Sequence, residues 1–352
     1  TRNMSSAASD VYKRQMRIQL GLGWLMCILA GIGFSILPLI YDVIGFERTL
    51  MRVYVGMNVS GQVIITAGIL SGNFSIFNSF TTIGITLLAA SVVCLWSPAL
   101  TIFKSNSDNG KKVGPFSYAL GSFLPIIGII AIACWALRDE FESALDLSER
   151  ILFDLFFSLS LIAIIISHIN RRLDWQIIQP DNTGKVFGVY ASLLLVSIVS
   201  KLLYEADDIS TRVVAVLQFI PYIFIFIMLK PMKIITQIRI EKPHNKMVIA
   251  SVFWLPVVGV TAYIEMMGYA QTTEAMMSYY RWILIFGVAF QVFWGFTAYL
   301  HEDHKKTPLK VRKTHWVSLI TVNIGALITV YALLSSWQTG EPRDNIARIG
   351  IG

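Results

Sequence analysis

Charged residues are scarce in this chain. Of its 352 residues only 14% are charged, against about 25% in a typical soluble domain, while 55% are hydrophobic and the mean hydropathy is +0.62. The charges gather in short stretches between apolar runs of about 20 residues. A helix of that length rises about 30 Å, the thickness of the hydrocarbon core of a bilayer. The shortage of charge therefore excludes an ordinary soluble domain and predicts membrane-spanning helices.

The strand pattern of an outer-membrane barrel is also missing. Such strands alternate apolar and polar residues over about ten positions, and runs such as Leu161–Ile166 do not alternate. Inside lipid every backbone N–H and C=O must be bonded within the chain, which helices achieve. We expect an all-α polytopic bundle of about ten spans, at residues 18–40, 53–71, 79–103, 115–137, 150–169, 186–204, 211–229, 247–267, 281–300 and 316–337.

No soluble domain or long linker interrupts these spans. We expect one transmembrane bundle over residues 16–340, followed by a polar tail at 341–352. The first 15 residues, Thr1–Gln15, are polar and lack the apolar core of a signal peptide. They resemble an adaptor-derived leader of metagenomic open reading frames and are left out of the fold analysis. On this interpretation the native chain begins upstream of Met16 and has at least eleven spans.

Basic residues concentrate on one side of the expected bundle. The loops after odd-numbered spans hold 18 Lys and Arg, and the opposite side holds 8 once the leader is left out. The side rich in Lys and Arg faces the cytoplasm in most membrane proteins, so both ends of the bundle are expected outside. This distribution explains the net charge of +7 without a nucleic-acid partner. The expected partner is the lipid bilayer of a bacterial or archaeal cell membrane (the inner membrane), and no protein partner is predicted.

Cysteines and catalytic motifs are few or absent. The three cysteines, Cys27, Cys94 and Cys134, all fall inside apolar spans, which argues against a disulfide framework. The sequence holds no P-loop, no dinucleotide-binding fingerprint, no G-x-S-x-G and no C-x-x-C. It therefore predicts no catalytic site.

Ionisable residues within the spans are also rare, and each costs about 2.5–3.5 kcal/mol at the centre of a membrane helix. Those at or near span ends on the expected outer side are Asp154, Lys201, Glu205 and Glu265. Lys201 and Glu205 are four residues apart and share one helix face. One interpretation is a polar vestibule open to the outside, and the other is snorkelling of these side chains to the interface.

Deeper polar residues and prolines mark further positions inside the spans. The amides of Asn58, Gln62, Gln291 and Asn323 are expected to hydrogen-bond between helices, with substrate binding as the alternative. Pro125, Pro221 and Pro256 fall well inside their spans and tend to kink them. A kink can serve as a hinge or a cavity wall, or can be ordinary packing.

All five histidines lie at the expected cytoplasmic ends of spans or in cytoplasmic loops, at His168, His244, His301, His304 and His315. His301 and His304 are three residues apart, not four as in the zincin motif, and lie beside a basic cluster that repels cations. This cluster is instead a candidate for contact with anionic lipid head groups, through Lys305, Lys306, Lys310, Arg312 and Lys313. No metal site is predicted.

The first span carries a family resemblance. Its residues read Gln19-Leu20-Gly21-Leu22-Gly23-Trp24-Leu25, then Ala30-Gly31-Ile32-Gly33-Phe34 and Ile36-Leu37-Pro38. This pattern resembles a helix of haem–copper oxidase subunit I-like and NnrS-like membrane proteins, which implies a helical bundle and a haem cofactor. In those proteins a histidine precedes the motif, and that place falls near Met16 here. The chain departs from the family because no histidine lies in the middle of any span, so no ligands are assigned.

Three function classes follow from these observations. The first is a respiratory or stress-related protein of the haem–copper-like type with its ligands missing. The second is a secondary transporter or channel, favoured by the interior prolines and the outer ionisable residues. The third is a membrane anchor or sensor whose attached domain lies beyond Gly352.

Overall fold

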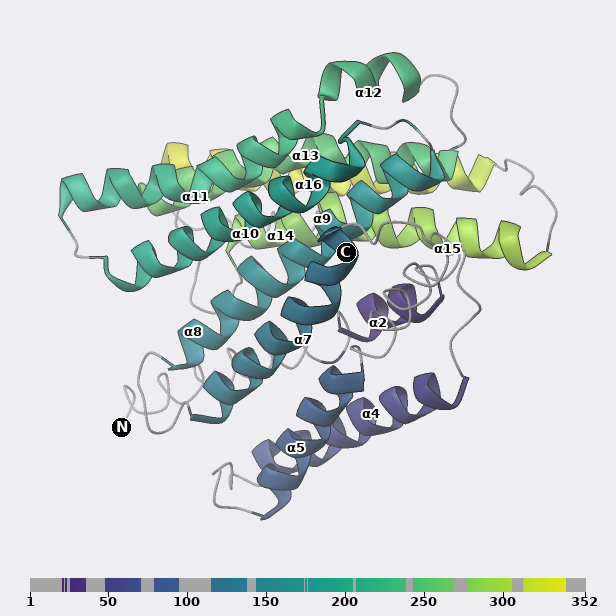
Figure 1. The fold of residues 1–352 in the computed structure, drawn as a ribbon. Coiled ribbons are helices and arrows are strands. Elements are labelled where there is room, and N and C mark those ends of the chain that lie inside the picture. Colours follow the sequence, from purple (N-terminus) through teal and green to yellow (C-terminus); the bar gives the residue numbers. More distant parts are fainter. Residues whose placement is uncertain are drawn as a thin grey trace. The chain divides into compact units, whose positions relative to one another are not determined.

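The structure is a computed structural model that describes residues 21, 23, 26–35, 48–70, 79–94, 115–137, 144–173, 175, 177–204, 207–238, 243–268, 278–305 and 313–339. These residues are 94% helical and include no β-strand (Figure 1). The expected all-α class is confirmed. The leader Thr1–Gln15 and the tail 341–352 lie outside the described residues.

Six helices within the described residues are long and apolar enough to cross a membrane: Ala144–Asn170, Asn182–Leu202, Asp208–Met228, His244–Met266, Tyr279–Ala298 and Trp316–Ser336. They coincide with the last six spans expected from the sequence. The first four expected spans fall on α2, α4, α5 and α7, where Phe80–Cys94 and Pro125–Ala136 are shorter apolar helices. The expected count of ten stays a prediction.

Apolar side chains cover the outside of several of these helices. Only 22% of the apolar window of α10, 33% of that of α11 and 22% of that of α16 is buried. The exposed side chains include Val189, Leu195, Val196, Val199, Val213, Val216, Ile320, Ile324, Leu327 and Tyr331. Soluble proteins rarely leave such large contiguous apolar faces in water. These faces indicate an all-α membrane protein.

The chain divides into two compact units, Thr1–Ser160 and Leu161–Gly352, and the boundary falls inside the helix Ala144–Asn170. We call them unit 1 and unit 2 and describe each by itself. The expectation of a single bundle stays a prediction.

Unit 1 contains α2 (Met26–Ser35), α4 (Arg48–Leu70), α5 (Ser79–Cys94), α7 (Pro115–Ala136), α8 (Ala144–Arg150) and the π-helix η3 (Ile151–Phe157). Helices α4 and α5 meet at two glycines, since a Cβ added to Gly61 would lie 2.9 Å from the backbone oxygen of Gly84. Asn58 links three helices, because the Cys27 thiol donates to its Oδ1 at 3.4 Å and its Nδ2 donates to Ser91 Oγ at 3.4 Å. Small residues and one amide therefore hold these helices together.

Unit 1 bears on two expectations from the sequence, one for the cysteines and one for the amides of Asn58 and Gln62. All three cysteines are free, in agreement with the absence of a disulfide framework. The interhelical bond expected of Asn58 is confirmed. Gln62 differs, because its amide nitrogen is buried and has no hydrogen-bond partner among the described residues.

Unit 2 contains most of α9 (Ser158–Ser167), then the π-helix η4 (His168–Arg172), α10 (Pro180–Leu202), α11 (Asp208–Met228), α12 (Pro231–Ile238), α13 (Pro243–Met266), α14 (Tyr279–Ile283), the π-helix η5 (Leu284–Ala289), α15 (Phe290–Lys305) and α16 (Lys313–Thr339). Proline begins α10, α12 and α13, where the missing N–H costs nothing. The interior prolines are confirmed at Pro221 in α11 and Pro256 in α13, as is Pro125 in α7 of unit 1.

Helix α13 is the centre of unit 2, with α11, α15 and α16 packed against it (Figure 1). Glycines permit the close contacts. A Cβ on Gly259 would lie 3.2 Å from the backbone oxygen of Phe219 in α11, and one on Gly295 of α15 would lie 2.7 Å from the backbone oxygen of His244. One on Gly287 of η5 would lie 3.0 Å from the Trp254 indole. Both ends and the middle of α13 are thus fixed against neighbours.

The contact of α4 with α5 gives a test. We expect Gly61→Ala to lower the thermal stability of the detergent-solubilised protein, by about 1–3 kcal/mol in free energy of unfolding, because the new methyl group meets backbone and cannot rotate away. Gly56→Ala on the same helix is the matched control, since nothing lies within 4 Å of its added Cβ. Equal melting temperatures for the two variants would contradict the packing of α4 on α5.

Candidate functional site

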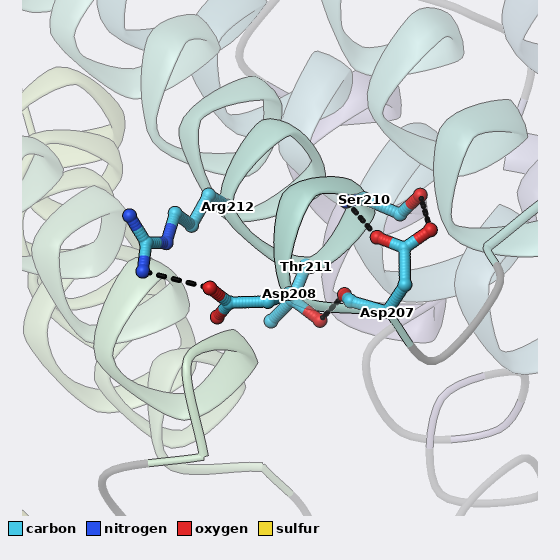
Figure 2. A network of polar contacts seen from close by, with 5 residues as sticks. All are labelled: Asp207, Asp208, Ser210, Thr211 and Arg212. Atoms are coloured by element: carbon cyan, nitrogen blue, oxygen red, sulfur yellow. Dashed lines mark hydrogen bonds and ion pairs between the residues drawn. The ribbon is translucent and has the colours of Figure 1, made fainter.

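The first turn of α11 carries a network of capping hydrogen bonds (Figure 2). Asp207 is the N-cap of α11, and its carboxylate accepts hydrogen bonds from the backbone N–H and the hydroxyl of Ser210, the latter at 3.0 Å. Thr211 Oγ1 donates to the Asp207 carbonyl at 2.6 Å and lies 2.9 Å from the Tyr204 hydroxyl. An aspartate at this position satisfies N–H groups that the helix itself leaves unbonded. The cap fixes where α11 begins.

Glu265 makes a second cap, supplied by a different helix. It lies near the end of α13, and its Oε1 accepts from the backbone N–H of Tyr279 at 2.6 Å while its Oε2 accepts from Tyr280 N–H at 3.3 Å. Ser278 precedes α14 as its N-cap but makes no side-chain cap bond. A carboxylate at a helix start is stabilising by about 0.3–1 kcal/mol, more when partly buried. Glu265 thereby joins the end of α13 to the start of the next span.

Two cations lie beside this carboxylate. Lys201, in the last turn of α10, has its Nζ 6.0 Å from the centre of the Tyr280 ring, and the Arg281 guanidinium lies 5.5 Å from the same ring. The positive charges of both act on the Glu265 carboxylate. Arg281 is 5% exposed and Tyr280 is likewise buried. We call Lys201, Glu265, Tyr280 and Arg281 the outer cluster, after the side of the membrane on which these positions are expected from the sequence.

The structure brings together part of the expected vestibule. Lys201 and Glu265, 64 positions apart in the sequence, meet at Tyr280 in unit 2. Asp154 lies in η3 of unit 1, and Glu205 lies outside the described residues. Sequence reasoning missed Arg281, because an arginine at the start of an apolar span looks like an interface anchor. The signal that marks it is the aromatic pair Tyr279-Tyr280 directly before it.

A second polar group lies deeper in unit 2, between α13, α15 and α16. The Trp254 indole N–H donates to Asn323 Oδ1 at 2.7 Å, and Gln291 Nε2 donates to the same oxygen at 3.1 Å. Asn323 Nδ2 donates to the backbone oxygen of Leu319 at 2.7 Å. The interhelical bond expected of Gln291 and Asn323 is confirmed, and Trp254 joins them without having been expected. We call Trp254, Gln291 and Asn323 the amide network.

Two of the five histidines have described side chains, both of them buried in unit 2. His168 is 1% exposed, with its ring in edge contact with Phe296 at 5.0 Å between centroids, and His244 is buried in α13. No group of three or more His, Cys, Asp or Glu side chains in the described part of the chain could hold a metal ion. The side chains of His301, His304 and His315 lie outside the described residues, as do those of the lipid-contact candidates Lys305, Lys306, Lys310, Arg312 and Lys313.

Comparison of the chain with protein-family models, with curated proteins and with solved structures gives no match.

The cap at Asp207 gives a prediction about pH. The hydrogen bonds from Ser210 hold the pKa of the Asp207 carboxyl below its usual value of about 3.9. A depressed pKa means that the cap stabilises the folded state above the unfolded pKa and loses that effect as the pH falls through the folded value. We therefore expect the first turn of α11 to keep its hydrogen-exchange protection at pH 5–7 and to lose protection below pH 4.

The comparison variants separate this cap from ordinary surface charge. Asp207→Ala should lower the protection factor of the Ser210 amide several-fold at pH 7. Asp208→Ala is the control, because Asp208 forms only an exposed pair with Arg212 at 2.8 Å, and such pairs contribute little. Equal protection in wild type and Asp207→Ala at pH 7 would refute the cap.

Proposed function

We propose that the chain is a secondary transporter or channel, and that a small polar solute or ion enters unit 2 through the outer cluster. The observation that supports it is the meeting of Lys201, Glu265 and Arg281 around Tyr280, at the ends of three different helices. Ionisable groups inside membrane helices are costly, and they commonly line pathways for ions or substrates. Three such groups in one place are more than an interface anchor requires.

The alternative role of the cluster is structural, since Glu265 caps α14. A cap needs an acceptor and nothing more, and the Ser278 side chain could have supplied one from the N-cap position. The chain instead uses a carboxylate from another helix and surrounds it with two cations. This arrangement makes the junction of α10, α13 and α14 sensitive to any ion or polar solute that exchanges partners with these charges. That sensitivity is what an entrance site requires.

The proposal includes an orientation and a span count. The cluster faces outward if the basic segments Lys230–Lys246 and Lys305–Lys313 remain in the cytoplasm, as the excess of Lys and Arg in these loops favours. On the same basis we propose about ten spans in the cell membrane of a bacterium or archaeon. Contact of Lys305, Lys306, Lys310, Arg312 and Lys313 with anionic head groups on the inner leaflet belongs to this proposal.

Flux into proteoliposomes tests the function. We expect the purified protein to move at least one of K⁺, Cl⁻, urea or glycerol faster than protein-free liposomes. Lys201→Ala and Glu265→Gln should each lower that rate about tenfold or more, because each removes one charge from the entrance. Arg212→Ala is the matched control, since this outer-side cation is exposed and lies outside the cluster. Wild-type flux no faster than protein-free liposomes, or equal effects of all three variants, would contradict the proposal.

A second candidate function is the redox role implied by the resemblance of the first span to haem–copper-type proteins. The observation in its favour is two buried imidazoles in unit 2, at His168 and His244. The donor set does not fit a haem–copper centre, because that centre needs several imidazoles in one place and the described residues offer no group of three metal-binding side chains. We therefore derive no step through haem. A reduced-minus-oxidised spectrum of the purified protein without haem bands would remove this candidate.

A further inference from the structure

The amide network has only one orientation that satisfies its contacts. An indole N–H can only donate, so the Asn323 atom that lies 2.7 Å from Trp254 Nε1 must be its oxygen. The other amide atom of Asn323 is then nitrogen, in agreement with its 2.7 Å contact with the Leu319 carbonyl, which can only accept. The Gln291 atom 3.1 Å from Asn323 Oδ1 must be nitrogen for the same reason. Trp254 thus fixes the orientation of both amides.

In this orientation one hydrogen-bond acceptor of the network has no donor. Gln291 Oε1 is buried and has no hydrogen-bond partner among the described residues, and the Gln291 side chain is 0% exposed. A buried acceptor without a donor costs about 1–3 kcal/mol, and native proteins satisfy nearly all such groups. Rotation of the Gln291 amide would not help, because it would bring two oxygens together at Asn323. Gln291 Oε1 therefore needs a hydrogen-bond donor that the described residues do not supply.

The network and the outer cluster share helix α13, and the continuous run α14, η5 and α15 also carries a residue of each. Ten residues separate Arg281 from Gln291 along α14, η5 and α15, which corresponds to about 15 Å of helix. Eleven residues separate Trp254 from Glu265 in α13, or about 16 Å. These distances are about half of the hydrocarbon core, so a cluster at the outer surface puts the network near the middle of the bilayer.

We propose that Gln291 Oε1 is the point at which unit 2 holds its solute, and that this solute is a small uncharged molecule that donates a hydrogen bond. The inference rests on the proposed transport function and names its substrate class. Gln291 accepts from the solute, Asn323 holds Gln291 in place, and Trp254 holds Asn323. The solute passes from the outer cluster to Gln291 along α13 and α15.

The absence of charge around the network sets the substrate class. Three stretches of the chain contain no Asp, Glu, Lys, Arg or His: 247–264 in α13, 282–298 in α14, η5 and α15, and 316–336 in α16. A carboxamide oxygen binds a neutral donor well, but it cannot compensate the cost of a bare ion in a region without counter-charge. Trp282, Phe286 and Phe290 stack one on another along α14, η5 and α15, the run that carries Gln291, at 5.5 and 6.0 Å between centroids.

The test compares flux and stability in the full-length protein, with urea and glycerol as neutral probes and K⁺ and Cl⁻ as charged ones. Wild-type proteoliposomes should admit urea or glycerol faster than protein-free liposomes. Gln291→Leu should lower that rate about tenfold, equivalent to the loss of one hydrogen bond. Its melting temperature should be unchanged or raised, because the substitution removes an unsatisfied buried acceptor while Trp254 still satisfies Asn323.

Two further variants control for damage to the helices. Gln218→Leu removes another buried amide of unit 2, one whose Nε2 lies 3.9 Å from Met266 Sδ, and should leave the flux unchanged. Trp254→Phe removes one of the two donors to Asn323 Oδ1 and so loosens the amide that holds Gln291 in place, and it should lower the flux while Gln291 remains.

The outcomes separate this inference from the proposed function. Movement of K⁺ or Cl⁻ but of neither urea nor glycerol would overturn the uncharged substrate class and leave the transport function standing. Unchanged urea and glycerol flux in Gln291→Leu, or a lowered melting temperature, would overturn the role of Gln291 alone. A wild-type protein that moves none of the four probes would overturn the transport function and the inference with it.

Discussion

Polar groups that a chain carries into hydrocarbon must find their partners within the chain, since no water is there to supply them. The backbone meets this requirement by forming helices, and α10, α11 and α16 expose apolar faces of the kind that suits lipid. Several polar side chains meet it by bonding to other helices. Glu265 joins α13 to α14, and Asn323 joins α13, α15 and α16. The polar contacts that stabilise unit 2 are also the places where we propose that it binds a polar solute.

Local sequence predicts much of this architecture. The apolar runs correctly predicted the six long apolar helices. Pro125, Pro221 and Pro256 lie inside helices, as expected. Such features depend on composition within one helix, which a single sequence displays directly. The interhelical bonding of Asn58, Gln291 and Asn323 was predictable for a similar reason, because an amide in lipid must bond to something.

The partners of each polar group could not be predicted in the same way. The sequence suggested Glu205, a neighbour on one helix face, as a partner of Lys201, and Glu205 lies outside the described residues. The structure places Lys201 beside Tyr280, 79 positions later, which no local pattern indicated. The sequence did not mark Arg281 as a site residue, and it did not indicate the hydrogen bond between Trp254 and Asn323. These contacts depend on which helices pack together, and glycines such as Gly287 and Gly295 decide that by allowing close approach. No local pattern specifies the neighbour that a glycine will meet.

Orientation across the bilayer is the claim on which the outward-facing entrance depends, and two positions test it most directly: Asp208 at the start of α11, and Lys242 directly before α13 in the sequence. In a protein with Cys27, Cys94 and Cys134 replaced by Ser, Asp208→Cys and Lys242→Cys each introduce one thiol for a membrane-impermeant maleimide applied to intact cells. The account predicts labelling at position 208 and none at 242 until the cells are opened. Labelling at 242 in intact cells, with 208 protected, would contradict it.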